Sequence, residues 1–222
     1  MAAVLQAAER EIVARWLGCV DYETTWRAMR DFTAARAPAT PDEIWLLEHP
    51  PVYTMGLKGH ARAPATHHGI PVVRSDRGGD MTYHGPGQLV VYLLLDLARL
   101  GLGAKGLVNL LEQAVIDLLA DNGVAAQRRT GAPGVYVSDR KIAALGLRVR
   151  GGRSYHGLAL NVDMDLAPFA HIDPCGMPGL GVTQLAELGI ASDMESVRRR
   201  LLDRLLNRLG YNRHSLLSVP KL

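Results

Sequence analysis

The segment QLVVYLLL, residues 88–95, constrains the fold more than any other part of this 222-residue chain. Nearly every position in it is apolar, whereas a strand with one face in water alternates apolar and polar side chains. Such a continuous run is typical of a strand that is covered on both of its faces. Its apolar part, Leu89–Leu95, is also much too short to cross a bilayer, which takes about 20 residues as a helix. The segment therefore predicts a buried strand and not a membrane span.

Apolar periodicity predicts helices in three further regions. The first covers residues 21–35, and the second ends at 122–123, an Asn-Gly pair that is typical of a helix stop. The third opens with a capping box, Ser192 to Glu195, and ends at Gly210. The apolar stripes are Tyr22, Trp26 and Met29 in the first helix, Leu107, Leu110, Leu111, Ala114, Val115, Leu118 and Leu119 in the second, and Met194, Val197, Leu201, Leu202, Leu205 and Leu209 in the third.

Strand-like segments lie between these helices without strict alternation, which favours an α+β or mixed α/β fold with a largely antiparallel sheet. Gly151-Gly152 separates two of them and is typical of a tight hairpin turn. No linker or repeat divides the chain, so we expect a single domain over residues 1–222. Besides 88–95, the expected strands are 43–48, 71–74, 134–137, 141–150 and 154–162.

Composition argues against several classes of protein. The net charge of +3 and the pI near 9.0 are too mild to indicate a nucleic-acid partner. Two cysteines cannot build a disulfide framework. The N-terminal residues 1–18 show no basic leader ahead of an apolar run, so we expect no signal peptide. The expectation is a soluble protein of the cytoplasm.

One cysteine stands in an unusual setting, the sequence DPCGMPG of residues 173–179. Its prolines fix φ and its glycines permit tight turns, so Cys175 is expected on a rigid, accessible loop. Reactive cysteines are partly accessible, whereas structural cysteines tend to lie in apolar surroundings. Cys19, in the apolar sequence WLGCV, is therefore expected to be buried and inert.

A nucleophilic Cys175 needs a neighbouring cation or base, because a thiol with a pKa of about 8.5 is only a few per cent thiolate at neutral pH. The sequence offers Lys141, His84, His156 and His171 for that role and does not choose between them. Lys141 heads a predicted strand, where a lysine is ordinarily solvated. Four other histidines occupy loop or tail contexts and are expected at the surface: His49, His67, His68 and His214.

A glycine-rich stretch, RGGDMTYHGPGQ at residues 77–88, could bring backbone N–H groups close to a ligand, or could be a plain turn between strands. It lacks the Gly-Lys-Ser/Thr of a phosphate loop, and no GxGxxG opens a helix there. Cysteines and histidines do not occur at metal-ligand spacings either. The sequence therefore argues against a nucleotide or metal site.

Taken together, these motifs resemble those of the lipoyl(octanoyl) transferases of lipoate biosynthesis. The resemblance implies the fold of lipoate- and biotin-protein ligases, a mixed sheet flanked by helices around an acyl-binding cleft, with a core of about residues 40–210. The matching stretches span roughly residues 45–185 and are EHPPVYTMG, RGGDMTYHGPGQ, GAPGVYV, KIAALGLRVRGGRSYHGLALNV and DPCGMPGLGVTQL.

By this resemblance Cys175 is the nucleophile and Lys141 assists it. Many relatives carry Asn-Pro-Cys-Gly, so Asp173 departs from the pattern. We expect its carboxylate to point away from the sulfur, because a nearby anion disfavours a thiolate. Backbone N–H groups of Cys175, Gly176 or the 78–79 turn are candidates to hold a developing oxyanion. The implied acyl pocket is lined by Arg77, Gly78, Gly79, Asp80, Met81, Thr82, Tyr83, His84, Ala144, Leu145, Gly146, Gly157, Leu158 and Ala159.

The implied activity is a ping-pong transfer of octanoyl from acyl carrier protein to a lysine of lipoyl domains, those of 2-oxoacid dehydrogenase E2 subunits and of the glycine cleavage H protein. It needs no ATP and no metal, and neither nucleic acid nor a membrane is an expected partner. The alternatives are an ATP-dependent lipoate- or biotin-protein ligase, which needs no nucleophilic cysteine, and an RNA-binding module that uses residues 148–153. The basic residues that could meet acidic carrier and lipoyl domains, or form a solvated face, are Lys58, Arg62, Arg74, Arg77, Arg148, Arg150 and Arg153.

Overall fold

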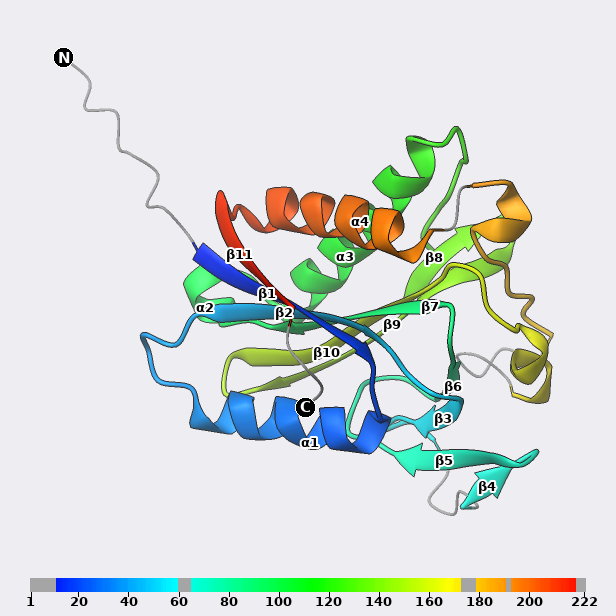
Figure 1. Cartoon of the computed structure of the whole chain (residues 1–222), viewed down its shortest axis with the longest axis horizontal. Coiled ribbons are helices and arrows are strands. Elements are labelled where there is room, and N and C mark those ends of the chain that lie inside the picture. Colours follow the sequence, from blue (N-terminus) through cyan, green and yellow to red (C-terminus); the bar gives the residue numbers. More distant parts are fainter. Residues whose placement is uncertain (1–10, 60–64, 173–178, 191–192, 219–222) are drawn as a thin grey trace.

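A computed structural model describes residues 11–59, 65–172, 179–190 and 193–218 of the chain. These residues form a seven-stranded sheet and a smaller four-stranded sheet, with helices on both faces of the larger one (Figure 1). In spatial order the larger sheet contains β11 (Arg213–Ser218), β1 (Glu11–Cys19), β2 (Asp42–Glu48), β7 (Gln88–Leu94), β10 (Arg153–Asn161), β9 (Arg140–Arg150) and β8 (Gly134–Val137). The smaller sheet contains β4 (Thr66–His67), β5 (Ile70–Arg74), β3 (Val52–Met55) and β6 (Met81–His84).

The strand pairing of the larger sheet is mixed. Strands β11, β1 and β2 are parallel, and every pairing from β2 through β7, β10 and β9 to β8 is antiparallel. The prediction of a mixed, largely antiparallel sheet flanked by helices is confirmed. Gly151 and Gly152 make the turn between β9 and β10 with φ of 56° and 75°, the left-handed values that glycine adopts without steric cost.

Strand β7 occupies the middle of the larger sheet and is buried over its whole length, as its apolar sequence predicts. Leu89, Val91 and Leu93 face the helices α3 (Ala104–Ala120) and α4 (Met194–Leu209). Val90 and Tyr92 face the opposite side, where α1 (Tyr22–Ala35) packs. Both faces are therefore covered, and Figure 1 shows α3 and α4 on one side of the sheet with α1 on the other.

The three long helices follow the predicted boundaries, with one correction at a cap. The Asp21 side chain caps α1 by accepting from the backbone N–H of Thr24. In α4 the N-cap is Asp193, whose carboxylate accepts from the Ser196 N–H. The N-cap is therefore the second residue of the predicted capping box and not its first, Ser192, which lies outside the described residues. Gly210 ends α4 with φ 75°, as expected.

Several elements were not predicted from the sequence. They include β1 and the edge strand β11, which bring the two ends of the described chain side by side in the larger sheet. Strand β6 forms inside the glycine-rich stretch, and the short strands β3 and β4 complete the small sheet. The remaining short elements are the helix α2 (Leu97–Leu100) and the 3-10 turns η1 (Ala167–His171) and η3 (Ala186–Leu188).

Within the described ranges, no helix is both long and apolar enough to cross a lipid bilayer.

Candidate functional site

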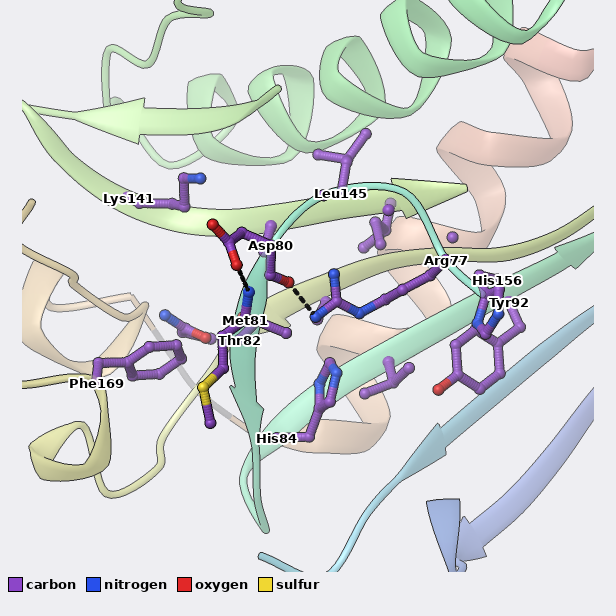
Figure 2. Close-up of a pocket in the computed structure, with 18 of the residues that line it drawn as sticks. Arg77, Asp80, Met81, Thr82, His84, Tyr92, Lys141, Leu145, His156 and Phe169 are labelled. Atoms are coloured by element: carbon purple, nitrogen blue, oxygen red, sulfur yellow. Dashed lines mark hydrogen bonds between the residues drawn. The ribbon is translucent and has the colours of Figure 1, made fainter. Parts of the chain in front are cut away.

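A cavity lies on the α1 side of the larger sheet, where β7, β9 and β10 meet strand β6 and the loop before it (Figure 2). Most of the predicted pocket residues line it: Arg77, Gly79, Asp80, Met81, Thr82, His84, Ala144, Leu145, Gly146, Gly157, Leu158 and Ala159. Gly78 and Tyr83 do not line it, and the Tyr83 ring packs instead in a small apolar cluster with Tyr53 and Met164.

Glycines let the chain come close enough to form this cavity. The Gly78 N–H donates to the carbonyl of Leu147 at 3.0 Å, so the loop before β6 lies directly on β9. A Cβ on Gly146 would stand 2.8 Å from the Gly78 carbonyl oxygen, and one on Gly157 would clash with the carbonyl of Val91. Side chains at these two positions would push the loop and β7 away, because such contacts are shorter than van der Waals packing allows.

Arg77 holds the loop in place from inside and does not face solvent. The residue is only 7% exposed. Its guanidinium donates to Thr54 Oγ1 at 3.0 Å and to the Thr54 carbonyl at 2.5 Å. It also donates to the carbonyls of Gly78 and Asp80, at 2.9 and 2.6 Å. The expectation that Arg77 could meet an acidic protein partner is wrong, because its donors are used within the fold.

Lys141 is buried at the start of β9, with only 4% of its surface exposed. Its Nζ lies 3.5 Å from the Pro133 carbonyl oxygen and 5.2 Å from the centre of the Tyr136 ring. A Cβ on Gly134 would stand 3.0 Å from Lys141 Cε, so the glycine leaves room for the lysine stem. Lys141 is thus not solvated, although a lysine at a strand end ordinarily is.

The backbone of Lys141 joins β9 to the segment that follows residues 173–178. Its N–H donates to the Gly181 carbonyl at 2.9 Å, and its own carbonyl accepts from the Thr183 N–H at 3.0 Å. Phe169 of η1, before residues 173–178, lines the cavity, as does Val182 after them. Both flanks of residues 173–178 therefore border the cavity that Lys141 lines.

Cys175 itself lies outside the described residues, together with Asp173 and Gly176, so the predicted roles of these residues stay predictions. Cys19 is described, and it is exposed at the end of β1. The expectation that Cys19 is buried in apolar surroundings is wrong, because the strand ends there and turns the side chain to solvent.

His49 is fully buried, which corrects its predicted surface position. Its Nδ1 lies 2.7 Å from the carbonyl oxygen of Val20, which can only accept, so Nδ1 carries the proton. Its Nε2 accepts from the Tyr92 hydroxyl at 2.8 Å. Burial lowers the pKa of His49 to about 4, so the imidazole is neutral at pH 7.

His84 is held in one tautomer by a chain of buried side chains. The Gln88 amide N–H donates to Asn161 Oδ1 at 3.0 Å, which leaves Gln88 Oε1 to accept from His84 Nδ1 at 2.7 Å. The other ring nitrogen lies 3.3 Å from the Thr54 hydroxyl. Burial lowers the pKa of His84 well below its usual value, so it too is neutral at pH 7.

Asp76 gathers donors next to His156, which lines the cavity. Trp26 Nε1 donates to it at 2.7 Å, His156 Nε2 at 3.0 Å, and the Tyr155 hydroxyl donates to its second oxygen. Burial by itself would raise the pKa of Asp76, but these hydrogen bonds outweigh burial and hold that pKa well below its usual value. Burial lowers the pKa of His156 despite the neighbouring carboxylate.

His171, the remaining candidate partner for Cys175, belongs to a different cluster. Its ring stacks on His68 with centroids 3.8 Å apart, and its carbonyl accepts from His67 Nε2 at 2.8 Å. His68 and His214 are exposed, as expected, and His67 is half-buried. Among the residues that the structure describes, no group of three or more His, Cys, Asp or Glu side chains is placed to hold a metal ion.

The cavity also has lining residues that sequence reasoning missed. Tyr92 offered a signal, because a tyrosine within a buried apolar strand must satisfy its hydroxyl and often marks a polar site. The other missed residues are separated widely in the sequence and carried no such signal; they are Tyr22, Val90, Asn161, Phe169 and Val182.

The architecture around this cavity is that of lipoate- and biotin-protein ligases. A lipoate-protein ligase A structure described as bound with ATP superposes with a TM-score of 0.72, covering 95% of this chain and 90% of that one at 15% identity. The biotin protein ligase from Aquifex aeolicus, in complex with biotin and ATP, gives 0.56 over 89% of this chain and 70% of its own, at 16% identity. At such identities the likeness establishes the fold alone.

Sequence similarity defines the family. The lipoyl protein ligase A/B catalytic domain model matches residues 21–206, and the chain belongs to this family. An octanoyltransferase of Aromatoleum aromaticum is 63% identical over 87% of this chain and 84% of its own length. That of Dechloromonas aromatica is 56% identical over 89% of this chain and 96% of its own. The chain is thus an enzyme of the transferase class within the octanoyltransferase branch of the family.

Proposed function

We propose that the protein transfers an octanoyl group from acyl carrier protein to a lysine side chain of lipoyl domains, through a thioester on Cys175. The acceptors in this proposal are lipoyl domains of 2-oxoacid dehydrogenase E2 subunits and the glycine cleavage H protein. The names of the relatives, octanoyltransferases at 54–63% identity, support the acyl group. A bi-partite lipoate protein ligase with its E2 lipoyl domain shares the fold, which supports the class of acceptor.

One observation supports the dyad above the others. The amine of Lys141 is buried at the cavity, and the described segments on both sides of residues 173–178 border that same cavity. The hydrogen bond from Lys141 N–H to the Gly181 carbonyl fixes the later of these two segments against β9. The burial of this amine beside both flanking segments is what supports a Cys175–Lys141 dyad, and Cys175 itself lies outside the described residues.

In the first step the Cys175 thiolate attacks the carbonyl carbon of the octanoyl thioester. The bond from that carbon to the carrier sulfur breaks, and the carrier thiolate takes a proton from the Lys141 ammonium, which becomes a free amine. In the second step the acceptor lysine amine attacks the new thioester, the carbon–Cys175 bond breaks, and an amide forms. Lys141, as the free amine left by the first step, takes the proton that the acceptor amine loses.

The lining of the cavity suits an alkyl chain. Strands β9 and β10 present small or aliphatic residues along it, and each methylene that leaves water contributes roughly 0.8 kcal/mol. The residues on the cavity side are Ala144, Gly146, Gly157 and Ala159. Leu145 and Leu158 also line the cavity, but they pack with the aliphatic cluster toward α3 and α4.

No ATP and no metal enter this proposal. Exchange of one thioester for another is nearly isoenergetic, and conversion of a thioester to an amide runs downhill, so no further activation is required. An ATP-dependent ligase is the alternative, since ligases share the fold.

The test is intact-mass analysis after incubation with octanoyl-acyl carrier protein. The expected result is an adduct of octanoyl mass that is absent in Cys175→Ser and intact in the matched variant Cys19→Ser. Addition of a lipoyl domain should discharge the adduct and acylate the domain without ATP. Loss of the adduct in Cys19→Ser, or a strict need for ATP, would contradict the proposal.

A further inference from the structure

His156 breaks the alternation of strand β10. Along this strand Leu158 and Leu160 face α3 and α4, while Tyr155 and Ala159 face α1. If the strand alternated regularly, the His156 ring would lie on the α3 side. Instead, the ring donates to Asp76 and so lies on the same side as the neighbouring Tyr155, which also donates to Asp76. The cause is its backbone, which has φ 60°, so two consecutive side chains reach one carboxylate.

Two features at His156 each cost free energy. A left-handed backbone is unfavourable for any residue with a Cβ. In addition, its Nδ1 is buried and has no hydrogen-bond partner among the described residues, although the residue is only 1% exposed. Such costs persist where a particular side-chain position is required. Because the ring lines the cavity, binding of the acyl chain there is the requirement that these costs point to.

His156 stands at the end of the cavity away from Lys141. Asn161 Nδ2 donates to the Thr183 carbonyl, and Thr183 pairs with Lys141, so the Asn161 end of β10 adjoins the lysine. His156 is five residues further along the strand (161 − 156 = 5), which is roughly 17 Å at the usual rise. Figure 2 shows Lys141 and His156 on opposite sides of the pocket.

Hydrogen-bonded groups lie at this end of the cavity: Tyr92 and His156 are buried, and the Asp76 side chain is 26% exposed. Tyr92 is held by His49, and behind His156 the carboxylate of Asp76 is anchored by Trp26 of α1. The imidazole cannot swing aside without breaking its 3.0 Å bond to Asp76. With C–C bonds of about 1.5 Å, an extended octanoyl chain spans roughly 9 Å, about half of the roughly 17 Å along β10, and a longer chain with its thioester head reaches the His156 end.

We infer that the acyl chain occupies the cavity, here called the acyl slot, and that the His156 ring closes its far end. The ring thereby sets the longest chain that the enzyme accepts. The inference rests on the proposed acyl transfer. Chains too long for the slot meet a ring that the left-handed backbone and Asp76 hold in place. His156 acts here by occupying space at the tip of the chain, and the reacting atoms lie at the other end of the slot.

The test compares octanoyl-, decanoyl- and dodecanoyl-acyl carrier protein as donors for the wild type and His156→Gly. Glycine adopts φ 60° without cost and removes the ring, so it suits the backbone while it lengthens the slot. The kcat/KM ratio of dodecanoyl to octanoyl should rise by roughly tenfold or more. His156→Asn, which also tolerates this backbone, should give a smaller rise and serves as the second variant should the glycine variant fail to fold.

His68→Gly is the matched control, because His68 also has a positive φ, 48°, but is exposed and outside the cavity. Its chain-length ratio should equal that of the wild type. A thermal-shift titration with octanoic and dodecanoic acid provides a readout that needs no transfer: dodecanoic acid should stabilise His156→Gly more than it stabilises the wild type.

The outcomes separate the two proposals. Absence of acyl transfer in the wild type contradicts the proposed function, and the fatty-acid titration still decides whether His156 closes the slot. If both His156 variants transfer octanoyl normally and their chain-length ratio is unchanged, the inference about His156 is overturned and the proposed function is not.

Discussion

The two faces of the larger sheet are built in contrasting ways. Among the described residues, the face toward α3 and α4 is covered mainly by aliphatic side chains from the two helices and from the strands, with Glu112 of α3 as a buried ionisable exception. The face toward α1 and the small sheet buries ionisable and amide groups, each tied to a partner. The buried polar residues on that side are His49, Thr54, Ser75, Arg77, His84, Gln88, His156 and Asn161.

The difference teaches where stability and specificity come from in this fold. Apolar packing is not directional, so the α3–α4 face can stabilise the sheet without fixing any single group. Buried polar groups must be hydrogen-bonded, and that requirement fixes the orientation of His84, His49 and Arg77 around the cavity. Variants on the first face should therefore change stability, and variants on the second should change chemistry.

The largest expected effect is on catalysis, from Lys141→Met. Loss of the amine should reduce octanoyl transfer by about 10²–10⁴-fold, the usual contribution of a positioned acid–base group. Single-turnover kinetics with octanoyl-acyl carrier protein measure it. Arg140→Met is the matched control, since Arg140 is the adjacent cation and pairs with Glu187 at the surface. Equal losses in both variants would show that Lys141 acts only through the charge of this region.

On the apolar face, Leu111→Ala should lower the free energy of unfolding by about 2–5 kcal/mol, because the side chain is fully buried and a cavity remains. Urea denaturation measures this change. Leu110→Ala, one position along α3 and only half-buried, should cost clearly less. The kcat/KM of folded Leu111→Ala should match the wild type. A tenfold loss of activity would break the division between the two faces.

Acid should weaken the polar face. Below pH 6.5 an unfolded histidine binds a proton that folded His49, with its pKa of about 4, does not bind. The free energy of unfolding therefore falls as the pH drops from about 6.5 to 4, by up to about 3 kcal/mol for His49. The lowered pKa values of His84 and His156 add in the same direction.

Urea denaturation at several pH values follows this loss. His49→Gln should flatten the dependence between pH 6.5 and 4, whereas His214→Gln, at an exposed site, should leave it unchanged. Identical slopes in the wild type and His49→Gln would mean that other groups carry the acid sensitivity.

The smallest effect is expected at the cap of α4. Asp193→Ala removes the acceptor of the Ser196 N–H and should cost about 1 kcal/mol of stability with no effect on transfer. Asp203→Ala, an exposed site inside the same helix, is the control and should change stability by less. The unfolding temperatures of the two variants, compared with that of the wild type, measure the stability cost of losing the cap.

The sequence by itself determined the local elements whose signal is periodic. The apolar segment 88–95 predicted the doubly covered strand β7, and the stripes on α1, α3 and α4 predicted which faces pack. The glycine-rich stretch and its family resemblance also indicated most of the residues that line the cavity. These features depend on neighbours in sequence, so they can be recognised without the fold.

Only the tertiary structure decided the environment of the polar residues. His49 was expected at the surface and is buried, Cys19 was expected in the interior and is exposed, and Lys141 is enclosed at a strand end. Strands β1 and β11 pair although they come from opposite ends of the described chain. Burial and hydrogen bonding arise from contacts between distant segments, and those contacts form only when the two layers pack around the sheet.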